Sequence, residues 1–260
     1  MSLYVEDSGP GPTHTLVFLH GFPMDHTMWD EQVALAKPRF RTIAYDHRGH
    51  GQSEVGNGQY AFERFVDDLF EVLDARQISK AILCGLSMGG YVALRAAERA
   101  PERITGLILC DTRSESDTNE ARLKRASTVK VIQNKGVPTF CEGFMKAVLA
   151  PETFTQKPSL IERIRHLIVK GSPVGMVGAV LAMAGRTDTT AALSTLRVPA
   201  IVIGGEKDAT VPPAAMEALA KAIPGATLAL IPNAGHFSNL ENPTAFNRHF
   251  QEFLQRIIVL

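Results

Sequence analysis

One short run constrains the fold of this chain more than any other: residues 81–90, which read AILCGLSMGG. Apolar residues lead into Gly-x-Ser-x-Gly, and a helical pattern of apolar residues follows. This order predicts a strand that turns sharply at Ser87 into a helix and exposes the serine in a strained backbone conformation. Side chains at Gly85 and Gly89 would clash with so tight a turn. The backbone N–H of Met88, at the helix N-terminus, is then free to bind a negative charge. A passive serine in a glycine-rich turn is the alternative.

A serine becomes a nucleophile near neutral pH only when a base and an orienting acid accompany it. Two later stretches supply these groups. Residues 198–208 predict a buried strand, a glycine turn and then Asp208, and residues 226–236 predict another strand and a loop with His236. Both side chains then lie beyond the carboxyl ends of strands, where open α/β sheets bind ligands. We therefore expect Ser87 to be the nucleophile, His236 the general base and then acid, and Asp208 the carboxylate that orients the imidazole.

Each of these side chains also has a simpler interpretation. Asp208 could cap the helix predicted after Pro212, and His236 could be a loop histidine with one hydrogen bond. Asp111 also ends a predicted strand and is an alternative acid for the same role. Asp46, at the end of another strand, is expected to cap a glycine-rich loop through backbone N–H groups.

A second oxyanion donor is expected from the loop after the first long strand, residues 15–23, which read TLVFLHGFP. The matching N–H belongs to Phe22, whose ring would also wall a substrate pocket, and His20 is expected to brace the loop. Pro23 has no N–H to donate. Trp29 follows on the next helical turn and is expected to pack in the core, with a place at the pocket edge as the alternative.

Five segments in this order resemble the signature of the α/β-hydrolase superfamily: His20–Pro23, Asp46–Ser53, Gly85–Gly90, Gly204–Asp208 and Asn233–His236. The match covers nearly the whole chain. The resemblance implies an α/β-hydrolase fold and serine chemistry without a cofactor. Within the superfamily the chain is similar to bacterial carboxylesterases, 3-oxoadipate enol-lactonases and cofactor-free haloperoxidase-like esterases. Serine at position 87 argues against members that use an aspartate nucleophile.

Strand and helix patterns alternate along the chain, which predicts an α/β fold with a mostly parallel central sheet and helices on both faces. Strands are predicted near residues 15–19, 40–45, 81–84, 106–110, 199–203 and 227–231, with a possible edge strand at 3–6. Core helices are predicted near residues 63–76, 88–98, 213–222 and 243–257.

The strand patterns stop between about residues 114 and 190, and four amphipathic stretches replace them (122–133, 138–149, 159–170 and 173–184). We predict a hydrolase core of residues 1–113 and 190–260, with residues 114–189 inserted as a helical cap over Ser87. Its apolar faces would form most of the substrate pocket. Met145, Met176 and Met183 could line an adaptable acyl site, although packing against the core is the alternative for each.

Composition excludes several other classes of protein. Lys plus Arg and Asp plus Glu are both 27 of 260 residues, so the balanced charge argues against a nucleic-acid partner. No apolar run approaches the roughly 18 residues of a membrane span, and the acidic N-terminus lacks a signal-peptide core. The three cysteines are expected to be free thiols in a reducing cytoplasm. His47 and His50, between glycines in a turn, do not suggest a metal site.

These observations predict a serine hydrolase that cleaves small carboxylic esters. A 3-oxoadipate enol-lactonase is the first alternative, and its anionic substrate would need a cation near the pocket. Arg113 is the candidate for that cation and Arg186 a weaker one, although a surface pairing of Arg113 with Glu115 or Asp111 is equally compatible. A slow-turnover signal receptor on the same fold is the second alternative. Whether a protein partner exists is left open.

Overall fold

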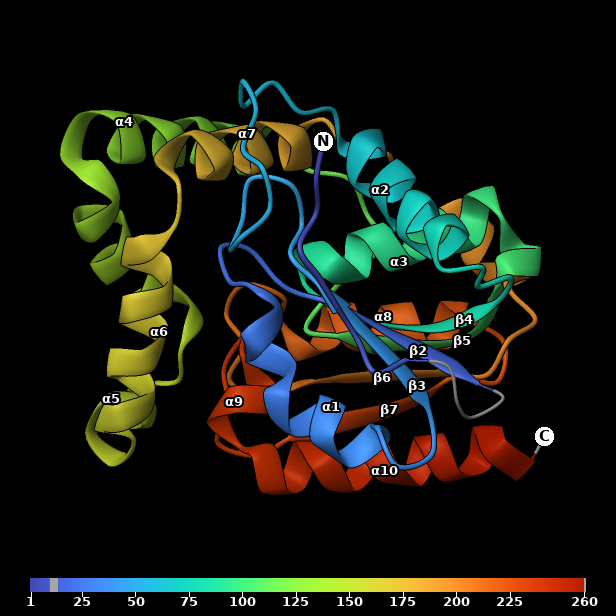
Figure 1. Ribbon diagram of the computed structural model, residues 1–260. Coiled ribbons are helices and arrows are strands. Elements are labelled where there is room, and N and C mark those ends of the chain that lie inside the picture. The colour runs from blue at the N-terminus through green and yellow to red at the C-terminus, as the bar shows by residue number, and fades with distance from the viewer. Residues whose placement is uncertain (10–13, 260) are drawn as a thin grey trace.

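The computed structural model describes residues 1–9 and 14–259. Seven strands form one sheet in the order β1-β3-β2-β4-β5-β6-β7 (Figure 1). Only β1 runs antiparallel to its neighbour, β3, and the other described strand pairs are parallel. The strands are β1 (Val5–Asp7), β2 (Thr15–Leu19), β3 (Arg41–Tyr45), β4 (Ala81–Leu86), β5 (Ile104–Cys110), β6 (Ala200–Gly205) and β7 (Thr227–Ile231).

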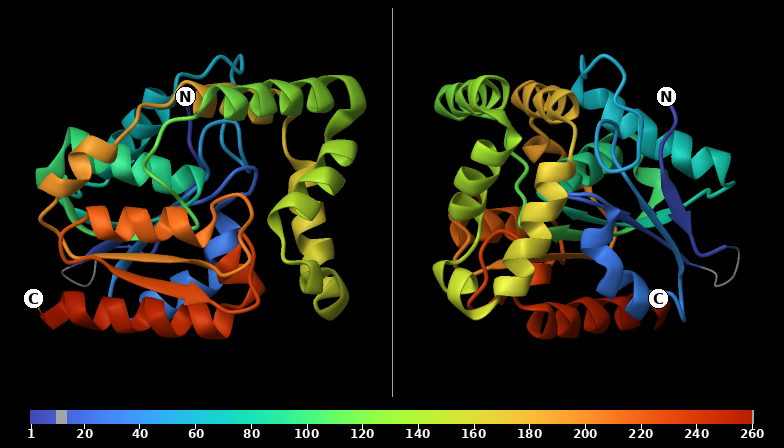
Figure 2. Two further views of the ribbon diagram at one scale, coloured as in Figure 1. Left: turned by 180° about the vertical axis from the view of Figure 1, so that it is seen from behind. Right: turned by 60° about the vertical axis from the view of Figure 1, so that its left-hand side comes forward.

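Helices cover both faces of the sheet (Figures 1 and 2). One face carries α2 (Phe62–Ala75), α3 (Met88–Arg99) and α8 (Pro213–Ala222), and the other carries α1 (Asp30–Ala36) and α10 (Pro243–Val259). Short turns complete the core: η1 (His26–Trp29), η2 (Pro101–Arg103), η3 (Thr190–Thr195) and α9 (Ser238–Glu241). Because both faces are covered, the central strands read as continuous apolar runs rather than alternating ones.

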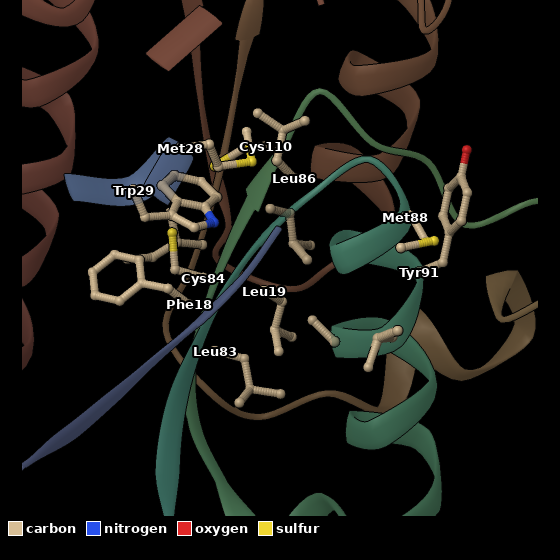
Figure 3. Close-up of a cluster of buried hydrophobic side chains, with 14 of the residues drawn as sticks. Phe18, Leu19, Met28, Trp29, Leu83, Cys84, Leu86, Met88, Tyr91 and Cys110 are labelled. Atoms are coloured by element: carbon tan, nitrogen blue, oxygen red, sulfur yellow. The ribbon is translucent and has the colours of Figure 1, made fainter. Parts of the chain in front are cut away.

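Strand β4, which leads directly into Ser87, is enclosed by its neighbours. Every residue of β4 is buried, and Figure 3 shows Leu83 and Leu86 among apolar side chains from neighbouring strands and from α3. Helix α3 can lie this close because glycines face the sheet at its start. A Cβ on Gly89 would lie 2.1 Å from the carbonyl oxygen of Leu19, and one on Gly85 would lie 2.3 Å from that of Gly89. These two glycines therefore fix the position of the turn at Ser87.

Between β5 and β6 the chain forms four helices, α4 (Asn119–Val148), α5 (Pro151–Gln156), α6 (Pro158–Lys170) and α7 (Pro173–Ala184). We call residues 114–189 the insertion. Figures 1 and 2 show it beyond one end of the sheet, with α4 and α7 side by side and α5 and α6 hanging beside the strand ends. Helix α4 is kinked at Gly136, whose φ is +81°, and Pro138 follows within the second half. The kink directs the second half of α4 down along the strand ends.

The two ends of the insertion are joined to each other. The carbonyl oxygen of Ser114 accepts hydrogen bonds from the backbone N–H (3.1 Å) and the hydroxyl (3.2 Å) of Thr189. Nearby, the buried carboxylate of Asp117 pairs with Arg125 and Arg186, and the Arg186 guanidinium lies 4.2 Å from the centre of the Tyr91 ring. Arg186 therefore anchors the root of the insertion to α3.

The predicted elements agree with the structure except in a few places. The first strand lies at Val5–Asp7 rather than 3–6, and the two predicted helices at 122–133 and 138–149 are joined as one kinked helix. The short helices α1, α5 and α9 have no counterpart among the predicted ranges, because each has too few residues to show a periodic pattern.

Among the described residues no single helix is long and apolar enough to cross a membrane, and α6 with α7, bent by 94°, passes the same test of length and composition only as a pair.

Candidate active site

The turn after β4 has the geometry that its sequence predicts. Ser87 has φ +52° and ψ −110°, a left-handed conformation that side chains rarely adopt. Three hydrogen bonds hold it there. The N–H of Ser87 donates to the carbonyl oxygen of Cys110 (2.9 Å), and its own carbonyl accepts from Tyr91 N–H (3.0 Å) and the Thr112 hydroxyl (3.0 Å). The strained conformation of Ser87 is thus stabilised by β5, by the loop directly after it and by the first turn of α3.

The structure brings Ser87, His236 and Asp208 together in one line of hydrogen bonds. Nε2 of His236 lies 2.9 Å from Oγ of Ser87, and Nδ1 lies 2.7 Å from Oδ2 of Asp208. All three side chains are buried, at 9% exposure or less. With its proton on Nδ1 toward the carboxylate, the imidazole presents an unprotonated Nε2 to the serine hydroxyl. This arrangement can remove the hydroxyl proton, which is the requirement for a nucleophilic serine.

The two aspartates near the histidine have separate partners. Oδ1 of Asp208 also accepts from the N–H groups of Thr210 (2.8 Å) and Val211 (2.9 Å), so Asp208 both faces His236 and orders the start of α8. Asp111 bonds instead to the hydroxyl of Ser238 (2.5 Å) and the N–H of Gly205 (2.9 Å). Burial, and then the charge of Asp208, raise the pKa of Asp111 well above its usual range. A protonated Asp111 does not suit the role of the orienting carboxylate.

The two expected oxyanion donors lie on either side of the serine. A Cβ on Gly21 would be 3.7 Å from Cβ of Ser87, so the loop carrying Phe22 runs directly past the nucleophile. Neither the N–H of Phe22 nor that of Met88 has a hydrogen-bond acceptor among the described residues. Two free backbone donors beside a serine match the requirement for stabilising a developing oxyanion.

Trp29 does not border this site. Its ring is fully buried and lies 5.6 Å from Phe18 and 6.4 Å from Phe246, between ring centres (Figure 3 shows it beside Phe18). The alternative of a pocket edge is therefore wrong for Trp29, since η1 turns the ring toward β2 and α10 instead of toward the strand ends.

Three buried histidines pack together beside the loop after β2 that carries Phe22, which we call the oxyanion loop. Nε2 of His20 accepts from the N–H of His47 (2.9 Å), and the ring centres of His47 and His50 lie 4.5 Å and 5.2 Å from that of His20. Burial lowers the pKa of all three, and that of His50 falls to about 3. The cluster is therefore neutral near pH 7, and His20 braces the loop as its place in the sequence predicts.

Asp46 orders the neighbouring loop, also as predicted. Its carboxylate accepts from the N–H of Gln52 (2.8 Å) and from both the backbone N–H (2.8 Å) and Nδ1 (2.7 Å) of His26. Burial opposes a charge on His26, but Asp46, together with Glu6 and Asp25, outweighs burial and raises the histidine pKa.

Aromatic residues that the sequence analysis missed surround Phe22. Phe140 and Phe144, one turn apart on α4, each lie 6.0 Å from Phe22 between ring centres. Phe144 also lies 6.2 Å from Phe237, the residue after His236. The second half of α4 therefore covers the site from the oxyanion side to the base side. Its phenylalanines could not be assigned from sequence, because the kink that turns them toward Phe22 depends on a single glycine.

The other predicted pocket residues lie in different places. Met145 is fully buried, and the sulfur of Met183 faces Arg125 at the root of the insertion (3.5 Å). Arg186 is bonded to Asp117, so it is not available to a substrate. Arg113 is half-buried and forms no ion pair within the described part of the chain, and its Nε is buried without an acceptor. The expected pairing with Glu115 or Asp111 is therefore absent there.

Met176 lines a separate cavity of about 410 Å³ between the insertion and the loops after β2 and β3. Pro23, His26 and His50 are in its wall, whereas Ser87 is not. The cavity therefore borders the oxyanion loop at Pro23 but does not include the nucleophile.

Among residues 1–9 and 14–259, two groups of three side chains could hold a metal ion by distance alone: Asp25 with His26 and Asp46, and Asp111 with Asp208 and His236. In both groups hydrogen bonds already engage every carboxylate and Nδ1 of the histidine. Asp25 accepts from the N–H (3.0 Å) and the hydroxyl (2.5 Å) of Thr27, and the other bonds are those described above. The donor sets therefore fit a proton-sharing network better than a metal centre.

Comparison with known proteins agrees with this geometry. Residues 14–243 match the family model described as alpha/beta hydrolase fold. A thermophilic esterase from Thermogutta terrifontis is similar in structure (TM-score 0.93, 38% identity, 98% of this chain and 93% of the other), and so is an enol-lactonase from Burkholderia xenovorans LB400 (0.90, 30%, 97% and 96%). The 3-oxoadipate enol-lactonase 2 of Acinetobacter baylyi is 28% identical over 95% of this chain and 91% of its own length. The chain is therefore a hydrolase of the alpha/beta hydrolase fold family, and the mostly parallel sheet predicted from its sequence is confirmed.

Proposed function

We propose that this hydrolase cleaves small carboxylic esters through an acyl-enzyme on Ser87. The observation that carries the proposal is the buried chain of hydrogen bonds from Ser87 through His236 to Asp208, at 2.9 and 2.7 Å. The similarity to an esterase over nearly the whole chain supports the same reaction class.

The reaction follows from the positions of these groups. Ser87 Oγ attacks the ester carbonyl while Nε2 of His236 takes its proton, and Asp208 stabilises the imidazolium that forms. The carbonyl oxygen becomes an oxyanion between the N–H groups of Phe22 and Met88. His236 then gives its proton to the leaving alkoxide. In the second half, His236 activates a water molecule, which releases the acid and restores Ser87.

The insertion is proposed to act as a cap on a core formed by residues 1–113 and 190–260. Phe140 and Phe144 approach Phe22 from the insertion, so substrate must enter beside these rings. Closing an apolar cap over the ester excludes water and strengthens the electrostatic interactions with the oxyanion.

Enol-lactone hydrolysis is the second candidate, and Arg113 is the observation that favours it. A half-buried guanidinium without an ion pair in the described structure can donate paired hydrogen bonds to a substrate carboxylate. If this is the natural reaction, 3-oxoadipate enol-lactone will be turned over far faster than neutral esters, and Arg113→Met will raise its KM while leaving ester hydrolysis unaffected.

The deciding experiment is steady-state hydrolysis of p-nitrophenyl esters from acetate to decanoate, with the enol-lactone in parallel. Ser87→Ala should lower turnover by about 10⁴-fold or more. A Ser87→Ala protein that keeps a tenth of the wild-type rate would contradict the proposal. Turnover of a few per hour on every substrate would favour the slow receptor, because enzymes of this kind typically turn over about 1–1,000 times per second.

A further inference from the structure

Glu241, at the end of α9, is a buried carboxylate that the proposed mechanism does not use. It is 1% exposed, and no arginine, lysine or histidine pairs with its carboxylate in the described structure. A buried charge of this kind persists only when hydrogen bonds replace its hydration. The donors that bind the Glu241 carboxylate therefore indicate its role.

One carboxylate oxygen binds the backbone on both sides of the proposed base. Oε1 of Glu241 accepts from the N–H of Gly235 (3.0 Å) and from the N–H of Phe237 (3.3 Å). These are the residues immediately before and after His236. The path of the main chain through His236 is thus fixed at two points by a single oxygen.

The other oxygen binds the insertion. Oε2 accepts from the N–H of Ala150 (2.8 Å) and from the hydroxyl of Thr153 (2.7 Å), where α4 ends and α5 begins. The two segments also meet directly, because the N–H of His236 donates to the carbonyl oxygen of Val148 (2.7 Å). A Cβ on Gly235 would lie 2.5 Å from that same oxygen, so only glycine allows this approach.

We propose that Glu241 is a positioning residue. It holds His236 in line with Ser87 by fastening the loop of residues 235–237 to the insertion at residues 148–153. The imidazole must reach both Ser87 and Asp208, and a main-chain shift of about 1 Å at such a base lowers turnover by about 100-fold. The inference rests on the proposed function, since His236 needs this placement only if it is the base.

The test uses the full chain and compares Glu241→Ala with Glu241→Gln and Thr153→Val. The alanine variant should lower kcat about 30- to 100-fold on the best p-nitrophenyl ester, with KM within threefold, because acylation and deacylation both use His236. The glutamine side chain keeps one carbonyl oxygen, so it can accept hydrogen bonds from the loop around His236 or from the insertion, but not from both. In this variant kcat should therefore fall about three- to tenfold. Thr153→Val removes one bond on the insertion side and should lower kcat by less than the glutamine variant.

A second readout follows the reactivity of Ser87 without turnover. The rate at which a fluorophosphonate modifies Ser87 should fall in the same order as kcat. The matched control is Asp68→Asn. Asp68 lies on α2, is equally buried, and its carboxylate pairs with Arg48 of the loop after β3 (2.6 and 2.5 Å). This variant should lower the unfolding temperature but keep kcat within twofold.

Some outcomes would overturn the inference. If Glu241→Ala folds and keeps kcat within threefold, or if kcat falls no further than in Asp68→Asn, Glu241 does not position the base. If the alanine variant does not fold, the glutamine and valine variants decide, and kcat within twofold of wild type in both contradicts the proposal. Activity that survives Ser87→Ala instead removes the proposed function itself, so the two failures are distinguishable.

Discussion

The conformation of Ser87 is imposed by its neighbours rather than by its own preference. A left-handed φ costs a residue with a Cβ about 1–3 kcal/mol. The three hydrogen bonds from Cys110, Tyr91 and Thr112 stabilise it, and the absent side chains of Gly85 and Gly89 leave room for it. These contacts come from β4, from β5 with the loop after it, and from α3. The nucleophile is therefore as rigid as the centre of the sheet.

At this scale the sequence was most informative. Ser87, His236 and Asp208 could be predicted as partners because each follows an apolar strand, and parallel strands bring their carboxyl ends to one edge of the sheet. Glu241 could not be found in this way. It follows no strand, its four-residue helix shows no pattern, and its partners at 150–153 are about 90 positions away in the chain.

The buried histidines give a prediction for stability against pH. His20, His47 and His50 have folded pKa values below the ordinary 6.5, so their contribution to stability is full above about pH 6.5 and is lost as pH falls toward the folded values. His26, whose pKa is raised, acts in the opposite direction. Neither ring nitrogen of His47 has a hydrogen-bond partner in the described structure, which makes it the residue to replace.

We expect His47→Leu to flatten the loss of stability in acid. Removing one such histidine should reduce the slope by up to about 1.4 kcal/mol per pH unit below pH 6.5. The measurement is urea unfolding at pH 7.5, 6.5 and 5.5, with the exposed His166→Gln as control. If the wild-type and His47→Leu slopes coincide, His47 does not take up a proton on unfolding.

Among the elements, the kinked helix α4 differs most from its prediction. Two amphipathic stretches were expected on either side of residue 136, and each is helical, but nothing in their spacing indicates that they join as one kinked helix. The direction of the second half depends on Gly136 at φ +81°. The sequence analysis considered methionines for the pocket, whereas the side chains that the second half of α4 turns toward Phe22 are Phe140 and Phe144.

These two rings predict a preference for short acyl chains. Phe144→Ala should remove most of the aromatic cover over Phe22 and raise the kcat/KM ratio of decanoate to acetate esters by about tenfold, since each methylene newly buried contributes about 0.8 kcal/mol. Leu123→Ala is the control, because Leu123 lies on the first half of α4 and is 69% exposed. An unchanged chain-length profile in Phe144→Ala would mean that substrate does not pass the Phe140–Phe144 face.

At the scale of the whole molecule, the insertion contacts the core in several regions. At its root Arg186 packs against the Tyr91 ring of α3, and at its far end Glu241 binds Ala150 and Thr153. Between them α7 approaches the loop after β3 so closely that a Cβ on Gly175 would lie 1.9 Å from the carbonyl oxygen of Gly49. Buried apolar side chains of the insertion, such as Met145 and Ile164, also join the apolar core of the sheet and its covering helices. The insertion, however, adds no strand to the sheet in the described structure.

Because no sheet hydrogen bonds tie the insertion to the core within the described residues, we predict that the insertion opens as a unit before the core unfolds. In native-state hydrogen exchange with increasing urea, amides of α4 to α7 should exchange through a common opening of lower free energy and smaller urea dependence than those of β2, β4 and β5. Glu241→Gln should lower the opening free energy of the insertion and leave that of the strands nearly unchanged, because it weakens only the hydrogen bonds that Glu241 makes. Exchange of insertion and strands with one shared free energy would contradict the division into cap and core, and would mean that substrate reaches Ser87 without movement of the whole insertion.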